Sequence, residues 1–360
     1  MIFGIIPPVT EDQMIERLEQ SFRYLVKLVH PDRAPDNLKI KANEVFHKLQ
    51  NARQAAEQAV KDKTYDKSFK AGGASKSAMP DSIISSSLGQ YTFGSEPLKT
   101  GDFSVLYNGT ASYSADPVLI KVASDPTFNT WLEKEATICN RVANEPKLAR
   151  LKPYVTEVKD TFIIQAPDSK QYRVTVMPYN RDKISVSDIL DSFKGKIPVE
   201  HAAWIARRVI AQAAAAAKIG VVHGAITPDH VLVDPIKHDP LHIGWGHAVL
   251  NPSVERITHV IDKWKDIYPA EVFNKDKPTE STDIYMAGKV IILLFGGNVK
   301  TNSMPKTIPP SIVKVIEKCV DPYDRYTSSL QVMEDLTNGV RAAWGRKYRA
   351  LNVFNNVVVH

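Results

Sequence analysis

Four histidines have side chains that could hold a transition metal, namely His223, His230, His242 and His247. Imidazole nitrogen is a common zinc ligand in proteins. These histidines fall in separate predicted loops without a diagnostic spacing, so we interpret them as core or solvated residues. The two cysteines, Cys139 and Cys319, fall in different predicted helices and also lack metal-ligand spacing. We therefore expect no metal site, and two inert thiols in a reducing compartment.

Three other residues could take part in binding phosphate groups. Gly101 lies in the stretch 98–107, Lys121 in the apolar stretch 118–122, and Glu135 in a predicted helix. They resemble the phosphate-covering loop, the lysine-bearing strand and the partner glutamate of protein kinases. This resemblance covers residues 91–345, with matching points in the right order. It implies an ion pair between Lys121 and Glu135, whereas the residues alone also allow an exposed lysine at a strand end.

Two further stretches, 222–233 and 241–246, keep the frame of a protein kinase and lack its acids. The resemblance implies that Ala225 replaces the catalytic base, while His230 and Gly244 replace the two metal-holding residues. An alanine accepts no proton, and a glycine offers no carboxylate oxygen to Mg²⁺. Phosphoryl transfer depends on positioning and charge neutralisation. We therefore predict a pseudokinase that is not an enzyme, with a degenerate nucleotide cleft and no cofactor.

The residues that hold the kinase fold together are present in the sequence. The resemblance implies that Asp283 caps the catalytic-loop backbone near His223, and that Arg325 forms a buried salt bridge with Glu271. Residues that hold the fold are thus kept where residues that move phosphate are gone. This separation favours a function in binding.

Residues 10–66 are predicted to form two amphipathic helices. Thr10 and Gln13 form a capping box, and apolar residues recur at helical spacing on either side of Pro31. The first stripe is Met14, Leu18, Phe22, Leu25 and Val29, and the second is Leu38, Ala42, Val45, Phe46, Leu49, Ala52 and Ala56. Such helices should pack antiparallel as a hairpin.

The loop of this hairpin carries His30-Pro31-Asp32, which resembles the J-domain of DnaJ-like co-chaperones. The resemblance covers about residues 3–66. It implies that the loop, together with Arg23 and Lys27 on the basic face of the preceding helix, engages a heat-shock ATPase chaperone. The alternative is a chance loop that ends a helix.

These patterns give an α+β chain. We predict a J-like helical domain at 1–66, a flexible linker rich in glycine and serine at 67–90, a β-rich kinase-like N-lobe at 91–180 and a helical C-lobe at 181–360. The predicted strands are 103–107, 118–122, 162–165 and 172–177. The predicted helices of this part are 128–142, 201–219, 282–295, 311–320 and 328–344.

Composition limits the function further. The 360 residues are 43% hydrophobic and 24% charged, with a net charge of +6, and no apolar run is long enough for a membrane helix. We predict a cytoplasmic adaptor that joins a chaperone to an unknown client or signalling protein. One alternative is an unconventional kinase or nucleotidyl transferase that uses Lys121 and Glu135. Another is a nucleic-acid-binding scaffold, which only the mild positive charge suggests.

Overall fold

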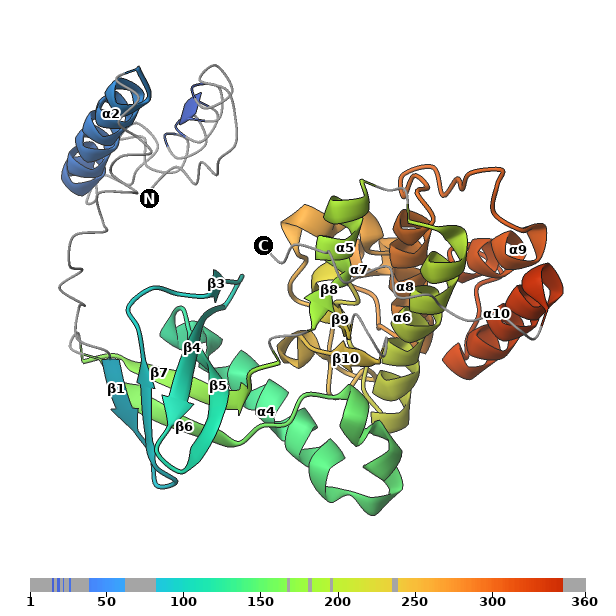
Figure 1. Ribbon diagram of the computed structural model, residues 1–360, viewed down its shortest axis with the longest axis horizontal. Coiled ribbons are helices and arrows are strands. Elements are labelled where there is room, and N and C mark those ends of the chain that lie inside the picture. Colours follow the sequence, from blue (N-terminus) through green and yellow to red (C-terminus); the bar gives the residue numbers. More distant parts are fainter. Residues whose placement is uncertain are drawn as a thin grey trace. The chain divides into compact units, whose positions relative to one another are not determined.

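The computed structural model describes residues 15, 18–19, 22, 26, 39–61, 82–166, 169–180, 183–194, 197–234 and 239–345. It divides into two compact units, Met1–Met79 and Pro80–His360 (Figure 1). Each unit is described by itself below.

The amino-terminal unit contains helix α2, Lys39–Lys61, and helical backbone at residues 15, 18–19, 22 and 26. Leu18 and Leu49 are buried. Arg53 of α2 donates to the Glu19 carboxylate at 2.6 Å, and its guanidinium lies 4.9 Å from the centre of the Phe22 ring. The second predicted helix is therefore confirmed and contacts the first helical segment. Val45, a member of the predicted apolar stripe, is 40% exposed.

The second unit begins with a β-rich lobe (Figure 1). Its antiparallel sheet has the order β1-β2-β4-β5-β7-β6, and β3 pairs with β4. The strands are β1 (Ser82–Ser85), β2 (Gln90–Phe93), β3 (Lys99–Thr100), β4 (Ser104–Ala111), β5 (Ser114–Ala123), β6 (Asp160–Gln165) and β7 (Gln171–Pro178). One helix, α4 (Asn129–Asn144), packs against this sheet and follows the 3₁₀ turn η4 (Pro126–Phe128), which Asp125 caps through the Thr127 amide.

The predicted linker 67–90 differs from the structure in its last part. Strand β1 lies within it and pairs with β2 from Ser82↔Phe93 to Ser85↔Gln90. The apolar pair Ile83-Ile84 gives this short segment strand character despite the serines around it. The sheet therefore starts about ten residues earlier than the composition indicates.

The helical lobe follows β7. Its helices are α5 (Val186–Phe193), α6 (Val199–Ile219), α7 (Ala270–Phe273), α8 (Glu280–Leu294), α9 (Pro310–Cys319) and α10 (Ser329–Trp344). A small sheet of order β10-β9-β8 joins Ile184–Ser185, Val231–Val233 and Pro240–His242. The 3₁₀ segments of the unit are η4, η5 (Pro146–Tyr154), η6 (Pro228–His230), η7 (Trp245–His247) and η8 (Asp262–Ile267).

Helices α6 and α8 form the centre of the helical lobe. Most side chains of α8 are buried, because α6, α9 and α10 all pack around it. A reciprocal capping box between Thr279 and Thr282 begins α8, and Gly220, with φ of +82°, ends α6 in the left-handed region. At Gly288 an added Cβ would lie 2.8 Å from Cys319, so α8 and α9 approach closely at this point.

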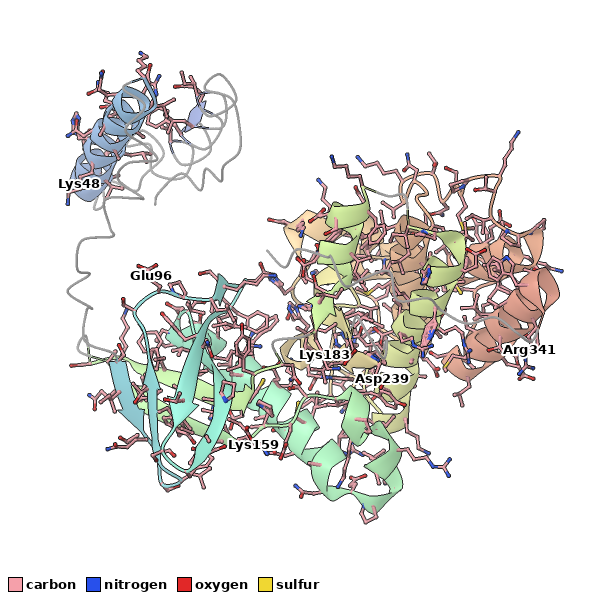
Figure 2. All side chains as sticks on the ribbon, in the orientation of Figure 1. Lys48, Glu96, Lys159, Lys183, Asp239 and Arg341 are labelled. Carbon is pink, nitrogen blue, oxygen red and sulfur yellow. The ribbon has the colours of Figure 1, made fainter. Side chains whose placement is uncertain are left out.

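The long predicted elements of the second unit are confirmed, with ends that differ by a few residues. Helix α5 and the small sheet were not predicted, because both are short and carry a weak periodic signal. Figure 2 shows charged side chains distributed over this unit, including the exposed Glu96, Lys159 and Arg341. Among the described residues, no helix is long and apolar enough to cross a membrane.

Candidate functional site

The lysine and glutamate expected in the cleft lie next to each other. Lys121 Nζ, on β5, lies 2.7 Å from Glu135 Oε2, on α4, and the two side chains are 11% and 2% exposed. Glu135 shares the buried face of α4 with Leu132. Glu133, two residues earlier, is 58% exposed and pairs instead with Arg173. Helical spacing on α4 therefore selects Glu135 as the partner that joins helix to sheet.

The loop that resembles a phosphate-covering loop is folded into the cleft. The Gly101 amide donates to the Ser104 carbonyl at 2.8 Å, which closes a tight turn. Phe103, at the end of this turn, is buried, and its ring centre lies 5.3 Å from Lys121 Nζ. The same ring lies 4.9 Å from the Trp131 ring and 4.8 Å from the His247 ring. Phe103 thus covers the lysine with an aromatic ring.

His230 contacts both Ala225 and Gly244. The Ala225 carbonyl accepts a hydrogen bond of 2.8 Å from His230 Nδ1, which places the proton on that nitrogen. Gly244 has φ of +83°, and a Cβ added there would lie 2.7 Å from the His230 ring. The imidazole of His230 therefore occupies the space in which a side chain at position 244 would lie.

The backbone before Ala225 is held by a buried carboxylate. Asp283 of α8 accepts hydrogen bonds from the His223 amide at 2.7 Å and from the Gly224 amide at 2.9 Å. Burial raises the pKa of Asp283 to about 7, and the two amide hydrogen bonds oppose this rise. The expected capping contact is therefore present in the structure.

One other expected fold contact is present, and His223 makes a contact that was not predicted. The Arg325 guanidinium donates to Glu271 Oε1 at 2.7 Å, and it lies 4.6 Å from the centre of the Tyr285 ring. The His223 ring is fully buried, and its Nε2 lies 3.0 Å from the Ile243 carbonyl. These contacts tie together segments that are far apart in the sequence.

Burial keeps the cleft histidines neutral. It lowers the pKa of His223, His230 and His247, and it lowers that of His242 to about 4. Three ring pairs form a row from His223 through His230 and His247 to His259, with centres 6.2, 5.2 and 5.6 Å apart. Within the described ranges, no three histidine, cysteine, aspartate or glutamate side chains are grouped to hold a metal ion.

Asp229 lies within the stretch 222–233, and its carboxylate contacts residues of η8. It accepts a hydrogen bond of 2.5 Å from the Trp264 indole, and its carboxylate lies 3.4 Å from Lys263 Nζ. Burial alone would raise the pKa of Asp229, but the Trp264 bond and the nearby cations hold it below its ordinary value. These contacts fix the carboxylate as an anion.

Sequence reasoning did not identify Trp131 and His259 as cleft residues. Trp131 lies in the first turn of α4 and is half-buried, and His259 lies in a segment without regular structure. Helical spacing places Trp131 near the buried face of α4, but only the tertiary contacts reveal that it packs on Phe103 and His259. The proposed chaperone-binding residues, His30, Pro31, Asp32, Arg23 and Lys27, lie outside the described residues.

Among the solved structures that resemble this chain is one titled "Structure of vaccinia related kinase 3". The match has a TM-score of 0.56 and 17% sequence identity, and it covers 79% of this chain and 97% of that chain. No protein-family model matches the sequence, and no curated protein matches it. At this identity the likeness shows the fold alone, which is a mixed helix-and-sheet, protein-kinase-like fold.

This comparison contradicts the prediction that the chain is not an enzyme. The matched structure is titled a kinase, and almost its full length aligns with this chain. Replacement of acids by Ala225, His230 and Gly244 is therefore insufficient to exclude catalysis in a chain with this fold, and the prediction is withdrawn.

Proposed function

We propose that this chain is an adaptor whose kinase-like unit binds a client or signalling protein through its surface, while its amino-terminal unit recruits a heat-shock ATPase chaperone. The observation that carries the proposal is the occupied cleft. Phe103 covers Lys121, and His230 fills the space beside Gly244. The contacts that stabilise the fold, such as Asp283 with the His223 amide, are retained around it.

The proposed function needs no bound nucleotide or metal. Mg²⁺ prefers oxygen ligands in a near-octahedral arrangement. Ala225, His230 and Gly244 supply no carboxylate at the three positions that hold or face the ion in a kinase, so these residues do not fit Mg²⁺. The Lys121 ammonium pairs with the Glu135 carboxylate at 2.7 Å and lies 5.3 Å from the centre of the Phe103 ring.

Recruitment of a chaperone rests on the sequence His30-Pro31-Asp32 between two amphipathic segments. The division of the chain into Met1–Met79 and Pro80–His360 supports it. A module tethered to a client-binding unit raises the effective concentration of the chaperone near that client without any new contact.

The test measures ATP hydrolysis by a heat-shock ATPase chaperone under single-turnover conditions, with and without the full chain. We expect stimulation by the wild type and its loss in His30→Gln. The matched control is His47→Gln, because His47 is an exposed histidine on α2 of the same unit. Absence of stimulation by the wild type, or equal stimulation by both variants, refutes the recruiting role.

A second candidate function is a kinase or nucleotidyl transferase that uses Lys121 and Glu135. The buried ion pair at 2.7 Å and the kinase-like fold favour it. The test incubates the chain with ATP labelled at the α or the γ phosphate, with Mg²⁺ or Mn²⁺. Transfer of the α label indicates nucleotidyl transfer, and transfer of the γ label alone indicates phosphoryl transfer. Loss of transfer in Lys121→Met but not in Lys159→Met supports this candidate over the adaptor.

A further inference from the structure

The turn between β3 and β4, residues 101–103, contacts both lobes of the second unit. Its Phe103 ring packs against Trp131 of α4 and against His247 of η7, with ring centres 4.9 and 4.8 Å away. The Phe103 carbonyl accepts a hydrogen bond of 3.1 Å from the Ser124 amide at the end of β5. One short turn therefore closes over the residues beneath it, which include Ala123 and Lys121.

The opposite wall is shaped to receive this ring. A Cβ added at Gly246 would lie 3.2 Å from the Phe103 ring and 3.0 Å from the Trp131 carbonyl oxygen. Both distances are tighter than ordinary van der Waals contact. The lack of a side chain at Gly246 thus makes room for the Phe103 ring, and a larger residue at position 246 would displace this ring.

The neighbouring residue of the turn makes a second contact. Asp102 Oδ2 lies 3.5 Å from His259 Nε2, and the two side chains are 44% and 38% exposed. The His259 ring in turn stands edge-on to Trp131, with ring centres 5.6 Å apart. This contact is an ion pair only when His259 is protonated, and between two side chains this exposed it is weak because water screens it. It can break without disturbing the core.

We propose that residues 101–103 form an autoinhibitory lid on the cleft, with Phe103 as its plug and the Asp102–His259 contact as its latch. The strand that leads into the lid, β3, has only two residues, and both are exposed. The lid can therefore swing while β4 and β5 remain paired. Its opening exposes Lys121 and Ala123 to solvent or to an anionic ligand. This inference rests on the second candidate function, in which Lys121 meets an anionic ligand, and the labelling test below measures opening of the lid independently of any transfer.

The test places a thiol under the plug. Ala123→Cys adds one sulfur at a position that packs against Phe103, and the native Cys139 and Cys319 remain as buried internal references. The full chain is treated with N-ethylmaleimide, and each thiol is quantified by mass spectrometry. Because local opening is more frequent than global unfolding, we expect Cys at 123 to react about tenfold or more faster than the two native thiols.

Three latch variants are compared in the Ala123→Cys background: Asp102→Asn, His259→Phe and their combination. His259→Phe keeps a ring beside Trp131. Each single change should increase the labelling rate at position 123 several-fold. The combined variant should be labelled no faster than either single variant, because both changes break the same Asp102–His259 contact. Asp116→Asn, an exposed carboxylate at the other end of β5, is the matched control and should leave the rate unchanged.

Equal labelling of all three thiols in every variant, or full additivity of the two latch changes, overturns the lid. If Ala123→Cys fails to fold, amide hydrogen exchange in chains without this substitution tests the opening of the lid instead. The Ser124 amide, which donates to Phe103, should exchange faster in Asp102→Asn than in the wild type or in Asp116→Asn. Identical exchange in all three chains contradicts the proposal.

Discussion

The ion pair between Lys121 and Glu135 allows a quantitative prediction of stability. At an effective dielectric constant of about 20, unit charges 2.7 Å apart attract each other by about 6 kcal/mol. Desolvation of two charges that are 11% and 2% exposed offsets most of this attraction. Removal of one partner strands the other charge in the interior. We therefore expect Lys121→Met or Glu135→Leu alone to lower the free energy of unfolding by about 3–5 kcal/mol.

The double variant Lys121→Met/Glu135→Leu should recover most of this loss. It leaves no buried charge, and its two apolar side chains fill similar volumes, so its stability should lie within about 1–2 kcal/mol of the wild type. The assay is urea unfolding followed by tryptophan fluorescence. All five tryptophans lie in the unit Pro80–His360, so the signal reports on this unit alone.

The matched control for this cycle is Lys159→Met, which removes an exposed lysine and should change the unfolding free energy by less than about 0.5 kcal/mol. The reasoning fails if the single variants are as mild as the control. It also fails if the double variant loses the sum of the two single losses, since the two residues would then act independently.

Three further predictions concern other parts of the second unit. Burial lowers the pKa of His242 from 6.5 to about 4. Between these two pH values the unfolded chain binds a proton at His242 that the folded chain does not. The unfolding free energy should therefore fall by up to about 3 kcal/mol as the pH is lowered from about 6.5 to about 4. Arg325→Lys should cost about 1–2 kcal/mol in urea unfolding, because lysine lacks the planar group that pairs with Glu271 and stacks on an aromatic ring. Gly244→Asp should lower the melting temperature, because φ at this position is +83° and the new Cβ would lie 2.7 Å from the His230 ring. The double variant Gly244→Asp/His230→Asn should recover part of this loss.

Each of these three predictions has a control variant or a result that would contradict it. His242→Gln should flatten the stability curve below pH 6.5 relative to the wild type, and an unchanged slope contradicts the assignment. Arg341→Lys, at an exposed position, is the comparison for the arginine, and equal effects refute the role of the salt bridge. For the glycine, a Gly244→Asp variant as stable as the wild type contradicts the close contact with His230.

The parts of the site that sequence could predict lie on long periodic elements. Lys121 lies on a strand and Glu135 on the apolar stripe of a helix, so the two elements follow from local patterns, whereas the pairing of the two side chains was implied by the resemblance to protein kinases. The packing of Phe103 on His247 joins a turn of the β-rich lobe to a 3₁₀ segment of the helical lobe. Such a contact depends on how the two lobes pack together, and no periodic sequence pattern in either segment indicates it.

The replacements at Gly244 and His230 show how the structure changes the meaning of a sequence pattern. In the sequence they are two separate departures from a kinase. In the structure they are one packing arrangement, since the His230 ring fills the space that a side chain at 244 would need, and it donates to the Ala225 carbonyl. A side chain at position 244 would therefore require the His230 ring to move. The three positions form one packing arrangement around this imidazole, because His230 contacts both Ala225 and Gly244.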